Sequence, residues 1–185
     1  MSTFGDGLDK AVQKAFTRPV PKSAGAQMRY LVKQHKGTRQ VAQMLRVSQR
    51  TVERYVKDQI KKPRPDLATR LETEVRKRWQ PQIRARARQN AATTGGIVID
   101  TRARLGYLAP IGSTDEDRIR HLTVALPPRH AARLFEAQEQ GAADDRLREI
   151  AAEALKETYF QDGGRRAGSL EEVRFTDIEH LEFDL

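Results

Sequence analysis

Residues 38–56 decide the fold of the N-terminal half, and they read TRQVAQMLRVSQRTVERYV. Val41 and Leu45 lie one helical turn apart, and a second apolar set begins at Val52. Between them stands Ser48, a residue type that caps helices through its hydroxyl. This order predicts two short helices joined by a tight turn, the pattern of a helix-turn-helix.

The turn of this motif departs from the usual pattern at one position. It carries Arg46, whereas glycine is usual there because the turn backbone often adopts a positive φ. Arginine can occupy that conformation at a modest cost. The alternative to a helix-turn-helix is an ordinary three-helix core with polar residues outside. The side chains that a helix-turn-helix would turn toward DNA are Arg39, Ser48, Gln49, Arg50, Thr51, Arg54 and Lys57.

Charge is divided unevenly along the chain. Residues 1–92 hold 22 Lys and Arg against 7 Asp and Glu, a net +15, whereas residues 93–185 hold 12 against 18, a net −6. A basic half attracts a polyanion such as DNA, and an acidic half suits protein partners. The alternative interpretation of this uneven charge is a charged surface that is simply solvated. Further side chains expected at DNA phosphates are Lys61, Lys62, Arg64, Arg84, Arg86 and Arg88.

Composition argues against several function classes. The chain has no Cys and only four scattered His, which argues against a disulfide framework, a thiol nucleophile and a zinc site. No glycine-rich phosphate loop and no supported Ser-His-Asp set is present, so we expect neither an enzyme nor a cofactor bound by the chain itself. We expect no membrane association, and a cytoplasmic, nucleoid-associated protein.

The C-terminal half has a different pattern of expected strands and helices. It predicts an interaction or dimerisation module, although strand–helix–helix order also matches ribbon-helix-helix proteins, in which strands pair across a dimer and enter the major groove. The expected elements are a strand at 97–99 paired with 102–108, a polar loop at 110–117, a strand at 119–126, and helices at 128–140 and 144–159.

The fold class predicted from these patterns is mainly α, and α+β overall. A helical domain with the helix-turn-helix precedes a smaller α/β interaction module of strands and two helices. The acidic-apolar tail can add a strand to a neighbour or stay disordered until a partner binds. The expected parts are a flexible arm at 1–22, the basic domain at 23–92 with a trailing Arg-rich helix, the loop and strand–helix–helix module at 93–162, and a linker and tail at 163–185.

Several long strings of the sequence are distinctive. They are AFTRP (15–19), KSAGAQMRYLVK (22–33), KKPRP (61–65), RWQPQ (78–82), TGGIVIDTR (94–102) and EHLEF (179–183). With these strings and the helix-turn-helix, the chain resembles the telomere terminal proteins of linear Streptomyces-type chromosomes and plasmids over nearly its whole length.

The resemblance implies a function that the residues alone do not. Such proteins cap linear replicons and become covalently joined to the 5′-terminal nucleotide, because a side-chain hydroxyl serves as the primer for a DNA polymerase that patches the telomere. The implied partners are telomeric DNA with its 3′ overhang, a telomere-associated protein and the polymerase, with possible self-association. A dNTP, expected to be dCTP first, and Mg²⁺ would come with the polymerase.

The primer hydroxyl that the resemblance implies is that of Thr114. A polar loop suits it because a primer hydroxyl must leave its own surface to enter a polymerase. The neighbours Asp115 and Asp117 can steer metal or basic polymerase residues, or can equally be a helix cap and a solvated turn. A helix-turn-helix regulator of transcription or plasmid maintenance, without covalent linkage, is the alternative function. Rival hydroxyls, from the residues alone, are those of Ser113, Thr93, Thr94 and Thr101.

Overall fold

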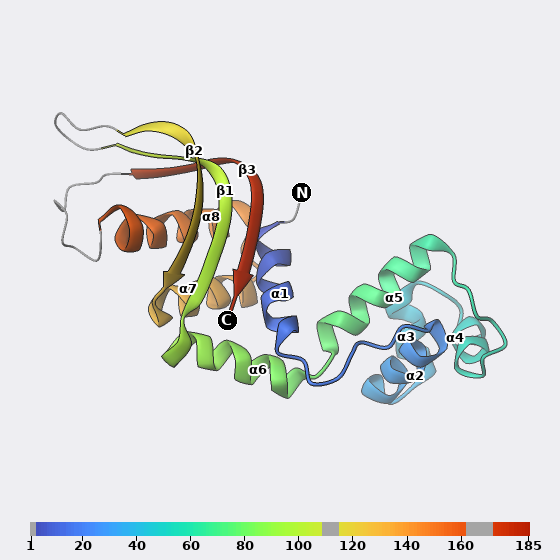
Figure 1. Ribbon diagram of the computed structural model, residues 1–185. Helices are drawn as coiled ribbons and strands as arrows, with labels where there is room; N and C mark the ends of the chain where they lie inside the picture. Colours follow the sequence, from blue (N-terminus) through green and yellow to red (C-terminus); the bar gives the residue numbers. More distant parts are fainter. Residues whose placement is uncertain (1–2, 109–114, 162–171) are drawn as a thin grey trace. The chain divides into compact units, whose positions relative to one another are not determined.

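The chain folds into two compact units. The computed structural model describes residues 3–108, 115–161 and 172–185. Unit 1 combines Met1–Phe16 with Gln82–Leu185, and unit 2 is Thr17–Pro81 (Figure 1).

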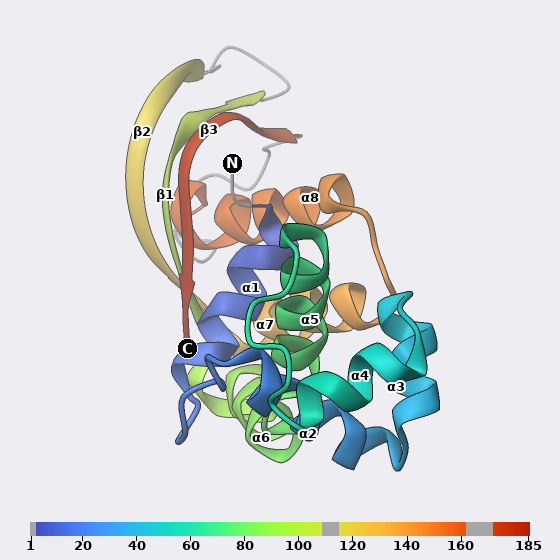
Figure 2. The same cartoon turned by 90° about the vertical axis from the view of Figure 1, so that its right-hand side faces the viewer.

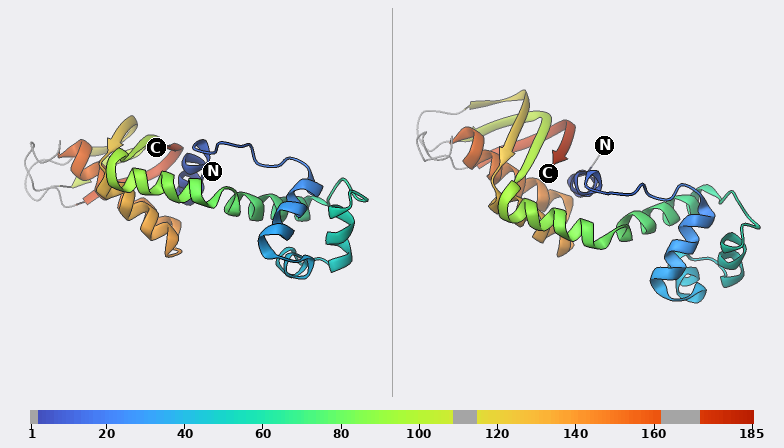
Figure 3. Two further views of the ribbon diagram at one scale, coloured as in Figure 1. Left: turned by 90° about the horizontal axis from the view of Figure 1, so that it is seen from below. Right: turned by 60° about the horizontal axis from the view of Figure 1, so that its bottom comes forward.

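Unit 1 is built on a three-stranded antiparallel sheet in the order β2–β1–β3. The central strand β1 spans Ile97–Leu108, and its neighbours are β2, Asp115–Leu126, and β3, Glu172–Asp184 (Figure 3). One face of β1 is buried through alternate residues, among them Ile97, Ile99 and Leu105. This period of two is what a sheet with one covered face requires.

Helices cover that buried face of the sheet. Its core is shared by α1 (Phe4–Lys14), α7 (Pro128–Glu139) and α8 (Asp144–Leu155), which lie together on one side in Figure 2. A further helix, α6, spans Pro81–Asn90, and π-helical turns follow α6 at Ala91–Gly95 and α8 at Lys156–Phe160.

The predicted pairing of residues 97–99 with 102–108 is wrong. The two segments form one continuous strand, because Asp100 and Thr101 pair with both neighbouring strands instead of turning. Of the loop predicted at 110–117, residues 110–114 lie outside the described residues, while Asp115–Asp117 already belong to β2. The strand at 119–126 and the two helices after it are confirmed, with α8 ending at Leu155.

The N-terminal segment differs from the flexible arm expected at 1–22. Thr3 caps α1 by accepting a hydrogen bond from the Asp6 N–H at 3.1 Å. Phe4, Leu8 and Val12 of this helix are buried in the core of unit 1. Local sequence patterns do not reveal that α1 belongs to this core, because its partners lie at the other end of the chain.

The acidic tail forms β3 and pairs with β1 of its own chain. Its buried residues Val173, Phe175, Leu181 and Phe183 join the core of unit 1. The tail therefore adds a strand, but it joins β1 of its own chain, whereas the expectation was a strand added to a neighbour or a tail that stays disordered until a partner binds.

Unit 2 is a cluster of four helices: α2 (Ala24–His35), α3 (Thr38–Leu45), α4 (Gln49–Val56) and α5 (Pro65–Arg78). Trp79 follows α5; its ring meets Tyr30 at 4.8 Å between centroids, and its Nε1–H donates to the Arg18 carbonyl at 3.0 Å. With its helices and one small sheet, the chain is mainly α and α+β, as predicted. The apolar core of unit 2 comprises Ala24, Met28, Leu31, Val41, Ala42, Leu45, Val52, Tyr55, Leu67, Leu71 and Val75.

Candidate nucleic-acid interface

Arg46 ends α3 and starts the connection to α4. Its backbone is left-handed, with φ 55° and ψ 47°, which is a common way to terminate a helix. The N–H groups of Arg46 and Val47 donate to the carbonyls of Gln43 and Ala42 at 3.1 and 2.9 Å. Arg46 thus occupies the positive φ expected of it, and its side chain stays exposed.

Ser48 caps α4, as predicted from its type and position. Its Oγ accepts a hydrogen bond from the Thr51 N–H at 3.2 Å and lies 2.8 Å from the Thr51 Oγ1. Both hydroxyls are therefore engaged in starting the helix, which fixes the direction in which α4 leaves the turn.

The inner side of α4 is anchored in the core of unit 2. Val52 is fully buried and Tyr55 nearly so. The Tyr55 hydroxyl donates to the Lys62 carbonyl at 3.4 Å, which ties the basic connector after α4 back to this helix. Burial raises the pKa of the Tyr55 phenol, so it remains a neutral donor.

The opposite side of α4 presents cations to solvent. The side chains of Arg50, Arg54 and Lys57 are exposed, as is that of Arg39 on α3, and no side-chain hydrogen bond or ion pair joins any of the four to another described residue. Gln49 is also exposed, and its amide donates to the Thr38 Oγ1 at 3.1 Å and the Glu53 Oε1 at 2.9 Å. A helix fixed on one side and cationic on the other can meet phosphates or base edges.

The connector after α4 extends the basic surface. Lys61, Lys62 and Arg64 are exposed, and Lys22 joins the first two around a hollow of about 380 Å³. The acid at this hollow, Glu72, is paired with Arg76 at 2.6 Å. Lys22 was not among the residues predicted from sequence, because nothing in its local pattern places it beside residues 61–62.

The arginines of α6 do not form one exposed row. Arg84 binds Asp9 at 2.8 Å, and Arg88 binds Glu139 at 2.8 Å and lies over the Phe135 ring at 5.5 Å. Both side chains are largely buried by these contacts within unit 1. Of the three arginines predicted to hold a DNA backbone, only Arg86 is exposed.

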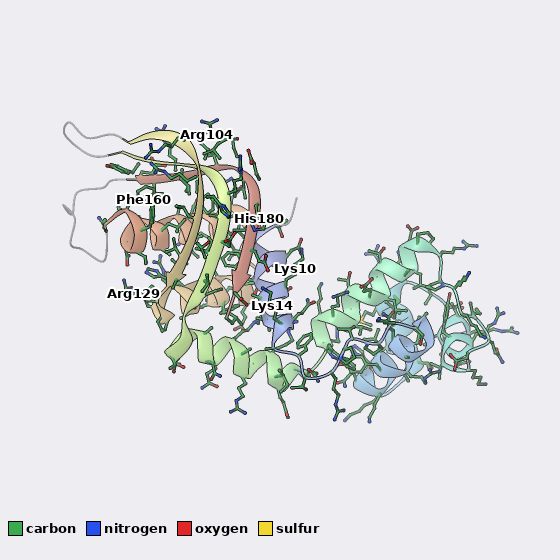
Figure 4. The ribbon with its side chains drawn as sticks, in the orientation of Figure 1. Lys10, Lys14, Arg104, Arg129, Phe160 and His180 are labelled. Carbon is green, nitrogen blue, oxygen red and sulfur yellow. The ribbon has the colours of Figure 1, made fainter. Side chains whose placement is uncertain are left out.

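A polar cluster on the open face of the sheet was missed by sequence reasoning. Asp100 accepts a hydrogen bond from the Thr123 hydroxyl at 2.6 Å, and its Oδ1 lies 3.3 Å from the His121 Nε2 and 3.1 Å from the His180 Nε2. The Thr123 hydrogen bond, with help from His121 and His180, holds the pKa of Asp100 below its usual value. The three strands bring these residues together, so only the sheet register could have revealed them; Figure 4 labels His180 on β3.

Metal-binding clusters and membrane-spanning helices are both absent from the described residues. Within residues 3–108, 115–161 and 172–185, no three His, Cys, Asp or Glu side chains are arranged to hold a metal ion. In the same part of the chain, no helix has both the length and the apolar character needed to cross a bilayer.

Thr114 lies outside the described residues, in the chain between the end of β1 and the start of β2. Comparison with known proteins adds no neighbour: no family model, no curated protein and no solved structure matches the chain.

Proposed function

We propose that unit 2 binds DNA as a helix-turn-helix, with α4 entering the major groove. The observation that carries this proposal is the two-sided character of α4: Val52 and Tyr55 are buried, while Arg50, Arg54 and Lys57 are exposed without partners among the described residues. The left-handed Arg46 and the Ser48 cap give the tight connection that such motifs need.

We propose further that the protein is a terminal protein of linear bacterial replicons and primes telomere patching. This step is supported by the resemblance of the long strings at 22–33, 61–65 and 94–102 to that family. The separation of a basic helical unit from a unit built on a sheet also suits a protein that must hold DNA and offer a hydroxyl. We assign that hydroxyl to Thr114.

The chemistry requires a partner enzyme. The Thr114 Oγ would attack the α-phosphorus of a dNTP, expected to be dCTP. One P–O bond forms to the threonine, the α–β bridging bond breaks, pyrophosphate leaves, and the hydroxyl proton passes to a base of the polymerase. An alcohol is a poor nucleophile near neutral pH, so the polymerase and its Mg²⁺ must lower the barrier. The chain is thus a substrate and primer, not a catalyst.

A priming assay tests this proposal. Purified protein, template overhang, polymerase extract and labelled dCTP should yield label on the 21.0 kDa chain that survives heat and detergent. Thr114→Val should abolish the label because it removes only the hydroxyl, whereas Ser113→Ala, the matched control one residue away, should keep it. Loss in Ser113→Ala with retention in Thr114→Val would move the attachment to Ser113.

The absence of label would favour a second candidate function. If every preparation stays unlabelled while unit 2 binds DNA, the free α4 surface supports a transcriptional or plasmid-maintenance regulator without covalent linkage.

A further inference from the structure

A hollow in unit 2 is lined by lysines from two distant parts of the chain. Lys22 lies just before α2, and Lys61 and Lys62 belong to the connector between α4 and α5 (Figure 1). The volume of this lysine hollow, about 380 Å³, lies within the range of sites that hold small ligands.

The positive charge of the lysine hollow is not offset from within unit 2. The side chains of Lys22, Lys61 and Lys62 are exposed, and no hydrogen bond or ion pair joins their ammonium groups to another described residue. The acid that lines the hollow is Glu72, whose Oε1 accepts hydrogen bonds from the Nε and Nη2 groups of Arg76 at 3.0 and 2.6 Å. Because Arg76 offsets the charge of Glu72, the hollow keeps a positive potential that attracts an anion.

Buried side chains hold both lysine-bearing segments in place. Gln27 is buried, and its side-chain amide donates to the Pro21 carbonyl at 2.8 Å, next to Lys22. The hydroxyl of the buried Tyr55 donates to the Lys62 carbonyl at 3.4 Å. The backbone on both sides of the hollow is therefore tied to the core of unit 2, which lowers the entropy lost when the lysines converge on one ligand.

A hydroxyl group completes the polar lining. The Ser23 Oγ accepts a hydrogen bond from the Ala26 N–H at 3.3 Å, and its own proton has no acceptor among the described residues. Ammonium groups and a hydroxyl donor together suit an oxyanion that can accept several hydrogen bonds at once, as a phosphate group does.

We propose that the lysine hollow binds one phosphate group of the DNA backbone, which Lys22, Lys61 and Lys62 share. This inference rests on the proposed DNA binding of unit 2 and adds to it a contact separate from those of α4. Lysine suits this task because its ammonium group is a point charge that can approach a phosphate from any direction. A contact of this kind positions the protein on the duplex without reading its sequence.

The salt dependence of DNA binding by the full chain tests whether the lysines share one phosphate. Each duplex phosphate that is no longer neutralised makes the slope of log binding constant against log salt shallower by about 0.9. A combined variant with Lys22→Gln, Lys61→Gln and Lys62→Gln should therefore change the slope by about 0.9, whereas three separate contacts would change it by about 2.7. A change near 2.7, or no change, overturns the proposal.

Inorganic phosphate tests the lysine hollow without DNA. In an NMR titration of the full chain, the backbone amides of Ser23 and Lys62 should shift and saturate. The saturable shifts should be lost in the combined glutamine variant and kept in Lys33→Gln, which removes an exposed lysine of α2 that does not line the hollow. Glu72→Gln should tighten phosphate binding several-fold, because it removes the acid at the hollow. Circular dichroism should show all these variants folded.

The two measurements separate this inference from the function on which it rests. Absence of saturable shifts in the wild type overturns the phosphate site, whether or not the protein binds DNA. Saturable shifts with an unchanged salt slope overturn the assignment to the DNA backbone and identify free phosphate as the source of the ligand. A wild type that binds phosphate but no DNA contradicts the proposed function of unit 2 and, with it, the DNA backbone as the ligand.

Discussion

Phe4 and Phe183 lie with their ring centroids 6.1 Å apart, although they stand at opposite ends of the chain. Phe4 also meets Phe175 edge to face, at 5.6 Å and 86°. Both partners belong to β3, so the first helix and the last strand of the chain stabilise each other in the core of unit 1.

Truncating Phe4 should therefore destabilise unit 1. Phe4→Ala is expected to lower its free energy of unfolding by about 3 kcal/mol, because a fully buried ring is replaced by a cavity. Hydrogen exchange of the β1 amides measures this, while the single tryptophan, Trp79, reports on unit 2 and should not change. Leu185→Ala, at a side chain 43% exposed, should cost less than about 0.5 kcal/mol. Unchanged protection of β1 in Phe4→Ala would mean that α1 is not part of the core.

Gly96 immediately precedes β1, at a place where no side chain fits. Its φ of 73° with ψ −158° belongs to a region that is essentially restricted to glycine. A Cβ would stand 2.2 Å from the Leu126 carbonyl oxygen. Gly96→Ala should cost well above the roughly 1–2 kcal/mol of a left-handed conformation alone, measured by chemical denaturation. Gly141→Ala is the control, because its φ of 77° is similar but its Cβ meets nothing within 4 Å. Equal costs for the two variants would argue against the clash.

Local patterns predicted unit 2 well, because its decisive features are local. Val41, Leu45 and Ser48 act within a few residues of one another, and the structure has them buried or capping as their spacing indicates. Unit 1 depends on contacts between distant segments. No sequence pattern near Phe4 indicates that β3 is its packing partner. No local pattern indicates that Asp100 contacts residues of β2 and β3.

The predicted DNA interface likewise could be found from sequence only where it depends on local patterns. Exposure and free cations on α4 follow from helical periodicity, so Arg50 and Arg54 could be found from sequence. The roles of Arg84 and Arg88 could not, because their carboxylate partners Asp9 and Glu139 come from α1 and α7. A row of arginines on one helix can thus be divided between structural and exposed roles.

Arg46 offers a test of strain in the turn. Because its φ is 55°, Arg46→Gly should relieve about 1 kcal/mol of left-handed strain, part of which the greater freedom of the unfolded glycine offsets. We expect a melting temperature of unit 2, followed by Trp79 fluorescence, that is equal to the wild type or slightly higher. Lys33→Gly, in the last turn of α2, is the contrasting control and should lower it by the usual cost of a helical glycine. A clear loss in Arg46→Gly would show that the arginine side chain itself stabilises the turn.

His130 should make unit 1 sensitive to mild acid. It is 1% exposed, and desolvation lowers its pKa below 6.5, although the Glu157 carboxylate 3.2 Å away acts in the opposite direction. Because the folded pKa is lower than the unfolded one, the unfolded chain binds the proton first. Stability is then highest above about pH 6.5 and falls as the pH drops below it.

The matched variant for this effect is His130→Phe, which fills similar space without titrating. The difference between the free energies of unfolding at pH 7 and pH 5 should be smaller in this variant than in the wild type. Glu157 keeps Arg129 as a partner at 3.0 Å, so the carboxylate is not left alone. An unchanged difference would mean that other groups cause the acid sensitivity.

Salt dependence should separate the exposed arginines of α4 from the buried ones of α6. The logarithm of the binding constant for DNA decreases as the logarithm of the salt concentration rises. This negative slope becomes shallower by about 0.9 for each duplex phosphate that the protein no longer neutralises. Arg50→Gln with Arg54→Gln should therefore flatten the slope by about 0.9 to 1.8, or by less with a loss of sequence discrimination if one of them reads a base edge. Arg50→Lys with Arg54→Lys keeps the charge and should keep most of the slope. Arg84→Gln breaks the ion pair with Asp9 and should lower the stability of unit 1 while leaving the slope unchanged. A slope that stays constant in the double glutamine variant, or falls in Arg84→Gln, would place the DNA on a different surface from α4.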